Sequence, residues 1–350
     1  MTGAARASAD WRPVPDAHAP AASRDDVIDT IRGIAILMVI GIHSLQQPLD
    51  TPWAVTIDAA LRPCVPIFLF ASGYLTALSR RVPLARRLKA ALIPYTIAFV
   101  AAYIYMALHN PAMDHRLIAT LARFGLAYVF VYYYVFVYIG CTIGLWLIFA
   151  ISGSGAPEQQ RRIAVFLALL IGFGLIVGSY LDPMLLRLGV SDSLIDEVRM
   201  RDIPFWFSFA ALGALAATCT DFSDRGMRIA VFSSMLTAYI AYAAVRLFGI
   251  GDAAVYDSTA FFGYAALFCL WLFTLRPRLP LLSAIGSGSY FIYLWHIFVV
   301  MILRDHLGLR QFGPAANFVV TYSLTALFSV ITLLAIRQFA SPRVFPWLGV

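Results

Sequence analysis

Charged residues are scarce in this chain of 350 residues. They make up 13% of the sequence, whereas hydrophobic residues make up 61%. A soluble domain usually carries charge on about a quarter of its residues, and the mean hydropathy of this chain is +0.79. This composition excludes a cytosolic enzyme. Long apolar runs take up most of the chain, so the sequence leaves no room for a separate soluble catalytic domain.

Lysine is almost absent. Of the 26 basic residues, one is Lys89 and the others are arginines. The net charge of +7 and the pI near 9.3 are compatible with nucleic-acid binding, but the arginines lie mostly in short connections between apolar runs. That distribution is typical of membrane topology, so we expect membrane lipids and no nucleic acid as partners.

Cysteine is also rare, and its positions are scattered. Cys64, Cys141, Cys219 and Cys269 show no C-x-x-C spacing, which argues against a disulfide framework or a zinc cluster. Free cysteines commonly behave as small buried hydrophobic residues. The sequence therefore predicts no metal site and no bound cofactor.

Ten apolar runs have about the length that a membrane-spanning helix requires. They cover residues 31–49, 63–79, 90–108, 124–151, 161–181, 203–220, 227–250, 254–275, 281–303 and 315–336. We therefore predict an all-α polytopic membrane protein with about ten transmembrane helices. The long fourth run is either strongly tilted or broken near its start.

The two ends of the chain are more polar than the rest. Residues 1–27 are rich in Ala, Pro, Asp and Arg and contain no apolar stretch typical of a signal peptide, so we expect a disordered tail. The transmembrane domain then covers 28–337 and a short tail covers 338–350. If the N-terminus is cytoplasmic, 17 of the 26 basic residues lie on the cytoplasmic side of the membrane. Because cytoplasmic connections usually hold the excess of basic residues, this count favours cytoplasmic termini.

Two ionisable residues share one face of the first predicted helix. Arg32 and His43 lie eleven positions apart, which is three turns plus about 20° and a rise of about 16 Å. Ionisable groups inside a span are costly and are functional candidates. The alternatives are that Arg32 extends to lipid headgroups and that His43 makes an interhelical hydrogen bond.

Three further segments attract attention. Ser72 precedes Gly73, a pair that permits close helix packing, and no G-x-S-x-G motif marks Ser72 as a nucleophile. His296 in the ninth run lies at a depth comparable with that of His43, without the carboxylate or thiol neighbours of a metal site. A dense basic segment would suit a nucleotide-bearing thioester or anionic headgroups; it consists of Arg80, Arg81, Arg86, Arg87 and Lys89.

Four sequence segments together resemble the acyltransferase 3 family of integral membrane O-acyltransferases. They are the R-x10-H pattern in 29–43, the F-x-x-S-G-Y-L segment in 68–75, the basic segment that leads into Ile93-Pro94-Tyr95, and the S-Y-x-x-Y-L-W-H segment in 289–296. The segments occur in the family order within a plan of ten helices. Any one alone is a weak signal, but four in order are a strong one.

The resemblance implies transfer of an acyl group, usually acetyl from acetyl-CoA, to a hydroxyl of a cell-surface glycan, an exopolysaccharide or a lipid-linked sugar. It implies a place in the bacterial inner membrane and essential roles for Arg32 and His43. Arg86 to Lys89 stands where the family has an R-x-x-R donor motif, with lysine in the last place, which keeps the charge but loses bidentate geometry. Secondary candidates from the matching segments are Asp29, Ser72, Tyr74, Tyr293 and His296.

The sequence leaves several alternatives open. His43 is suited to act as a general base on the acceptor hydroxyl, and a covalent acyl-enzyme is the competing mechanism. A transporter or flippase would instead use His43 and His296 as a proton relay. A purely structural membrane subunit would leave both histidines and the basic segment without a role.

Overall fold

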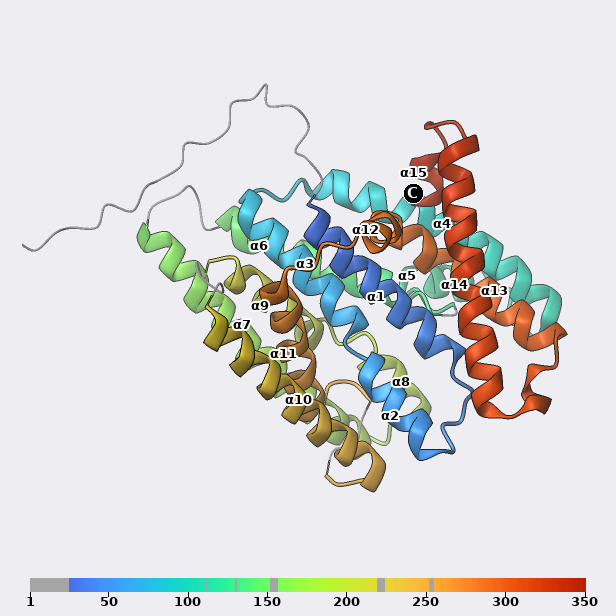
Figure 1. The fold of residues 1–350 in the computed structure, drawn as a ribbon, viewed down its shortest axis with the longest axis horizontal. Coiled ribbons are helices and arrows are strands. Elements are labelled where there is room, and N and C mark those ends of the chain that lie inside the picture. The colour runs from blue at the N-terminus through green and yellow to red at the C-terminus, as the bar shows by residue number, and fades with distance from the viewer. Residues whose placement is uncertain (1–24, 111, 130, 152–156, 219–223, 252–254) are drawn as a thin grey trace, which may run out of the picture.

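The protein folds into a bundle of helices (Figure 1). The structure is a computed structural model that describes residues 25–110, 112–129, 131–151, 157–218, 224–251 and 255–350. Within these ranges all regular structure is helical, with no strand, which confirms the predicted all-α class. The first 24 residues, which belong to the predicted tail, lie outside the described ranges.

The central helix is α1 (Asp26–Ser44). Its first turn is capped by Asp25, whose carboxylate accepts a hydrogen bond of 3.0 Å from the backbone N–H of Val27, and such a cap satisfies a helix donor that has no intrahelical partner. Most side chains of α1 are buried, because α3, α12, α13 and α14 surround the helix. Figure 1 shows α1 crossing the middle of the bundle.

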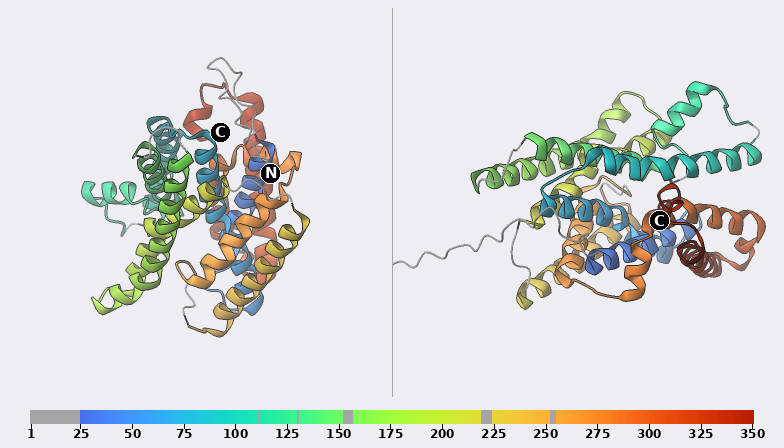
Figure 2. Two further views of the ribbon diagram at one scale, coloured as in Figure 1. Left: turned by 90° about the vertical axis from the view of Figure 1, so that its left-hand side faces the viewer. Right: turned by 90° about the horizontal axis from the view of Figure 1, so that it is seen from above.

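The other helices complete the bundle around α1. Their bounds are α2 (Pro52–Leu61), α3 (Cys64–Ser79), α4 (Leu84–His109), α5 (Leu117–Gly125), α6 (Tyr133–Ile151), α7 (Pro157–Arg187), α8 (Asp192–Arg199), α9 (Ile203–Ala216), α10 (Arg225–Phe248), α11 (Thr259–Leu275), α12 (Pro280–Gly286), α13 (Ser289–His306), the 3-10 helix η1 (Leu309–Phe312), α14 (Pro314–Phe339) and α15 (Phe345–Leu348). Figure 2 shows α4 to α7, in green and cyan, along one side of the bundle.

Helices α3 and α9 pack unusually closely. A Cβ atom at Gly73 would lie 1.9 Å from the backbone oxygen of Ala210, and one at Gly213 would lie 2.0 Å from that of Phe70. The two backbones therefore touch through glycines, which is how membrane helices gain packing contacts without a hydrophobic driving force. The predicted packing role of the segment around Gly73 is confirmed.

The number of spans that the helix lengths support is lower than the predicted ten. Among the described residues seven helices, or eight with the bent pair α12 and α13, are long and apolar enough to cross a membrane. Helix α9 has 14 residues and α11 has 17, so α9 rises only about 21 Å against a hydrocarbon core of about 30 Å. Most residues of α9 are buried, and a buried core helix is apolar for the same reason as a span.

Two predicted spans contain breaks. The fourth run is broken and not simply tilted, because α5 ends at Gly125 and α6 begins at Tyr133. The ninth run, predicted as one helix, bends by 78° between α12 and α13. A Cβ at Gly286 would lie 1.7 Å from the backbone oxygen of Asp29, so α12 ends in direct backbone contact with α1. The bend then directs α13 toward the carboxyl half of α1.

Candidate active site

His43 of α1 and His296 of α13 lie side by side in the bundle. Their ring centroids are 5.4 Å apart, and His296 has no exposed surface. The two helices come from opposite ends of the sequence, and contacts between α1 and α13 bring them together. The similar depths expected for the two residues therefore correspond to a single pair of imidazoles.

Hydrogen bonds define the tautomer of the neutral His296 ring. Its Nδ1 lies 3.0 Å from the carbonyl oxygen of Ile292 and 2.9 Å from that of Tyr293. A carbonyl oxygen only accepts hydrogen bonds, so Nδ1 carries the hydrogen. The Nε2 atom is then a lone-pair acceptor, and it is buried with no hydrogen-bond partner among the described residues. A buried acceptor without a partner costs free energy, so its presence calls for a functional explanation.

Three tyrosine hydroxyls hold α13 in place beside this pair. Tyr293 donates to the carbonyl oxygen of Val131 at 2.7 Å, and Tyr290 donates to that of Ala91 at 2.7 Å. Tyr132 donates in the other direction, to the carbonyl oxygen of Leu294 at 2.8 Å. These bonds connect α13 to α4 and to the segment before α6, so the backbone that carries His296 is fixed from two sides.

A cavity of about 480 Å³ opens at the carboxyl end of α1, and His43 forms part of its wall. We call it the carboxyl-end cavity. Arg62, Tyr133 and Tyr256 contribute polar atoms to it. The remaining wall residues are Ile42, Ser44, Leu45, Gln46, Gln47, Val131, Met200, Ile297, Val300, Met301, Arg304, Arg310, Asn317 and Thr321.

A second cavity, of about 320 Å³, approaches from the amino end of α1. We call it the amino-end cavity. Arg32 lines it together with Arg87 of α4. Four tyrosines and several smaller residues complete the wall: Phe68, Ala90, Ala91, Tyr134, Tyr138, Ser287, Ser289, Tyr290, Tyr293, Pro346, Gly349 and Val350.

A hydrogen bond links a wall residue of one cavity to a wall residue of the other. Tyr293 lines the amino-end cavity, and its hydroxyl bonds to Val131, which lines the carboxyl-end cavity. The ring of Tyr293 also lies 6.4 Å from that of His296. The two cavities thus approach the histidine pair from opposite ends of the bundle.

The amino-end cavity continues along the surface of the bundle. A hollow of about 200 Å³ shares Arg32 and Ser287 with it. A third hollow, of about 390 Å³, shares Ser287 and extends to Arg278 and Arg337. The three share Ser287, and the two adjoining hollows are lined by carboxylates as well as arginines: Asp26 and Asp29 lie with Arg278 and Arg337, and Asp25 and Asp29 lie with Arg32.

Arg32 is partly buried at this end, with 33% of its side chain exposed and Asp29 at 3.5 Å as its ion-pair partner. Asp29 lines both adjoining hollows, so this secondary candidate belongs to the same end of the bundle. Arg32 and His43 therefore border different cavities on one helix. Eleven positions of α1, a rise of about 16 Å, separate these two wall residues.

The basic segment is only partly brought to the site. Arg87 is half-buried, lines the amino-end cavity and donates to the hydroxyl of Thr76 at 2.7 Å. The other four cations are exposed and line neither cavity; they are Arg80, Arg81, Arg86 and Lys89. The position that departs from the R-x-x-R pattern is therefore at the surface and not in the cavity.

Ser72 and Tyr74 are not brought to the histidine pair. The backbone oxygen of Ser72 accepts a hydrogen bond from Thr76 at 2.6 Å, and the ring of Tyr74 packs 5.0 Å from that of Phe273. Neither residue lines either cavity. Their contacts are those of helix packing.

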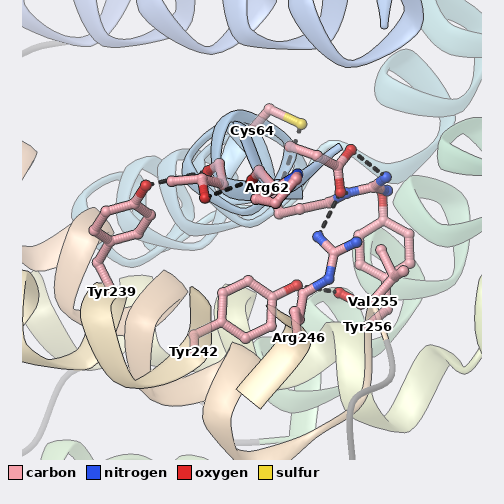
Figure 3. Close-up of polar contacts among 10 residues, drawn as sticks. Arg62, Cys64, Tyr239, Tyr242, Arg246, Val255 and Tyr256 are labelled. Carbon is pink, nitrogen blue, oxygen red and sulfur yellow. Dashed lines mark hydrogen bonds and ion pairs between the residues drawn. The ribbon is translucent and has the colours of Figure 1, made fainter. Parts of the chain in front are cut away.

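Sequence reasoning missed a buried charged cluster beside the carboxyl-end cavity. Asp58 has no exposed surface and accepts two hydrogen bonds from Arg62, at 2.9 and 2.6 Å, and a third from Arg246. Arg62 also donates to the hydroxyl of Tyr256 at 2.7 Å. Figure 3 shows the cluster, with Tyr242 packed beside Arg246. The spacing of Asp58 and Arg62, four residues apart in a helix, was the available signal.

The chain's C-terminal residues were also missed as part of the site. The sequence predicts a short tail over 338–350, but Pro346, Gly349 and Val350 line the amino-end cavity. A short helix, α15, contacts α4 there. The end of the chain therefore lies at the same end of the bundle as the start of α1.

The described residues contain no group of three or more His, Cys, Asp or Glu side chains that could hold a metal ion. Cys64, Cys141 and Cys269 are free and buried, whereas Cys219 lies outside the described ranges. The chemistry that the arrangement offers is proton transfer by buried imidazoles, with cationic groups at both entrances.

Comparison with known proteins gives one family match. A family model described as an acyltransferase domain, that of acyltransferase 3, matches residues 25–334. No curated protein and no solved structure matches the chain significantly. The matched region contains both histidines, Arg32 and Arg87, and covers nearly the whole chain. The chain therefore belongs to the acyltransferase 3 family and is a multi-pass membrane acyltransferase.

Proposed function

We propose that this protein transfers an acyl group, acetyl in the simplest case, from acyl-CoA to a hydroxyl of a cell-surface glycan, an exopolysaccharide or a lipid-linked saccharide. The observation that carries the proposal is the approach of two cavities from opposite ends to the pair His43 and His296. One cavity has the character of a donor site and the other that of an acceptor site.

The amino-end cavity suits the donor. Arg32 and Arg87 line it, and no Asp or Glu is among its wall residues, so both guanidinium groups are available to phosphate oxygens. The exposed cations of the basic segment raise the local concentration of an anionic ligand through long-range attraction. The tyrosine-rich wall deeper in the cavity fits the less polar arm of the thioester, whose reactive carbonyl would then lie near the histidine pair.

The proposed chemistry needs one proton acceptor. His43 removes the proton from the acceptor hydroxyl as its oxygen attacks the thioester carbonyl. The new C–O bond forms, the C–S bond breaks, and the proton passes to the leaving thiolate, which gives an ester and free CoA. His296 would support this transfer, because its Nε2 lone pair is buried beside the His43 ring.

The proposed reaction also implies a membrane and an orientation for the protein. We propose the bacterial inner membrane, with the amino end of α1 and the C-terminal residues facing the cytoplasm, where acyl-CoA is made. The excess of arginines in the corresponding connections supports this orientation. The carboxyl-end cavity then faces the outer side, where glycans are modified.

The test is acyl transfer by purified protein in lipid nanodiscs. Radiolabelled acetyl-CoA is supplied with a glycan extract from the source cells, and labelled ester and free CoA are measured. We expect His43→Ala to lose at least 100-fold in rate, as is common when a general base is removed. The matched control is His109→Ala, which removes an exposed histidine at the end of α4. Wild-type ester formation by His43→Ala would refute the proposal.

A transporter or flippase is the alternative, because it would also use cavities that open at opposite ends. It would move a saccharide across the nanodisc or vesicle membrane without consuming acetyl-CoA. Saccharide movement that is lost in His43→Ala, together with unchanged acetyl-CoA, would favour this alternative.

A further inference from the structure

The carboxyl-end cavity is lined by cations without acidic residues. Arg62, Arg304 and Arg310 form part of its wall, whereas no Asp or Glu does. The uncharged polar groups there include Gln46, whose amide oxygen is buried and accepts no hydrogen bond from the described residues. Such a lining attracts an anion that also carries hydrogen-bonding groups.

Part of this positive charge is buried and held rigidly. Arg62 has only 11% of its side chain exposed, Arg246 has 7%, and both bond to the single carboxylate of Asp58. Two guanidinium groups and one carboxylate leave one net positive charge in the cluster. Buried charge is costly unless it is paired, so a further anion at this wall would stabilise the cluster.

The acidic residues nearby in the chain are engaged elsewhere. Asp257, which follows Tyr256, pairs with Arg199 at 3.2 Å, and Asp182 and Asp196 pair with the same guanidinium. Asp305 pairs with Arg304 at 3.0 Å but does not line the cavity. None of these carboxylates contributes to the wall that Arg62 and His43 share.

We propose that the carboxyl-end cavity binds an anionic group, a carboxylate or a phosphate, of the hydroxyl-bearing acceptor, so that the acceptor is an acidic or phosphate-bearing saccharide. The inference rests on the proposed function and narrows its substrate class. Arg310 and Arg62 would hold the anion by charge-assisted hydrogen bonds, while His43 in the same wall faces a hydroxyl. The volume of about 480 Å³ lies in the usual range for small-molecule sites.

Binding tests the inference independently of catalysis. The probes are p-nitrophenyl β-D-glucuronide and p-nitrophenyl β-D-glucoside, which differ in one carboxylate, and binding to the wild-type protein in phosphatidylcholine nanodiscs is measured by equilibrium dialysis. We expect the glucuronide to bind at least tenfold more tightly, since a hydrogen bond to a charged group contributes about that factor. Equal binding of the two probes, or binding of neither, would overturn the anionic subsite.

Variants locate the subsite. Arg310 is exposed, so Arg310→Gln is compatible with folding and should reduce the preference for the glucuronide to about threefold or less. The matched control is Arg187→Gln, which removes an exposed cation at the end of α7 and should leave the preference unchanged. An unchanged preference in Arg310→Gln, or an equal loss in both variants, would contradict a subsite at this cavity.

Two further measurements distinguish a saccharide from a lipid as the source of the anion, and the acidic-acceptor proposal from the proposed acyl transfer. Nanodiscs that contain phosphatidylglycerol test whether a lipid headgroup occupies the site. A glucuronide preference that persists in these nanodiscs supports an acidic acceptor. Loss of the preference there assigns the site to lipid and overturns the acidic-acceptor proposal. Acetyl transfer is measured with both probes. Equal transfer to both, abolished by His43→Ala, would refute the acidic acceptor and leave the proposed function intact, whereas glucuronide-selective binding without any transfer would refute the function alone.

Discussion

Asp58 is the residue whose loss should destabilise the protein most through electrostatics. Its carboxylate is fully buried and is the only one that contacts Arg62 and Arg246 among the described residues. Asp58→Ala removes three hydrogen bonds to charged groups and leaves two guanidiniums unpaired in the bundle. Removal of one partner from a buried ion pair typically costs about 3–5 kcal/mol, a factor of roughly 100 to 5,000 in the ratio of folded to unfolded protein.

The measurement is unfolding of purified protein in a fixed detergent, followed by loss of helical circular dichroism. Asp305→Ala is the control, because it breaks the exposed pair with Arg304 and exposed pairs contribute about 0–1 kcal/mol. A triple variant, Asp58→Leu with Arg62→Met and Arg246→Met, removes all three charges and should recover most of the loss. The reasoning is wrong if Asp58→Ala unfolds like the wild type, or if the triple variant is no more stable than the single one.

Two other predictions concern packing and protonation. Gly73→Ala should destabilise the protein by more than about 3 kcal/mol, because its methyl group would lie 1.9 Å from the backbone oxygen of Ala210. Its control is Gly263→Ala in α11, whose methyl group would meet nothing within 4 Å and which should stabilise the protein by about 0.5–1 kcal/mol. Equal effects of the two substitutions in the unfolding assay would refute the close contact at Gly73. Burial, helped by the nearby Asp182 charge, raises the pKa of Asp202 to about 6; this carboxyl lies just before α9. The folded protein thus holds a proton between about pH 4 and 6 that the unfolded chain releases, so this residue's contribution to stability falls as pH rises through that window. Asp202→Asn should therefore raise the unfolding temperature at pH 7.5 and leave it nearly unchanged at pH 4, and a larger gain at pH 4 would show that the sign is wrong.

The sequence was sufficient to predict the features that depend on local pattern. Apolar runs separated by arginine-rich connections predict an all-helical membrane protein. The spacing of Arg32 and His43 predicts a shared helix face, and the structure places the two residues in the walls of two different cavities. Counting residues along the predicted helices also places His296 at a depth comparable with that of His43, and in the structure the ring centroids of these two histidines lie 5.4 Å apart.

The features that were missed depend on contacts between distant segments. Arg246 is 188 residues from Asp58 in the sequence, so nothing local indicates that one carboxylate serves two arginines. The short helix α9 is as apolar as a span because it is buried among α3, α6 and α7. A hydropathy pattern responds in the same way to lipid and to a protein interior, which is why the sequence offers more apolar runs than the described residues contain helices long and apolar enough to span a membrane. Val350 joins the amino-end cavity only because α15 packs on α4.

The wall between the two cavities distinguishes the proposed reaction from transport. A transporter moves whole helix repeats to expose one site alternately to each side, because its substrate itself must cross. Here the charged donor and the hydrated acceptor would each remain at their own end, where the cost of moving charge into the bilayer is avoided. Only the acyl group has to pass Tyr293 and reach the histidine pair. Tyr293 is buried there among the rings of Tyr132, Tyr134 and Tyr290, and its hydroxyl donates to the carbonyl oxygen of Val131, so the side chain at this point is fixed and the two substrates stay on their own sides.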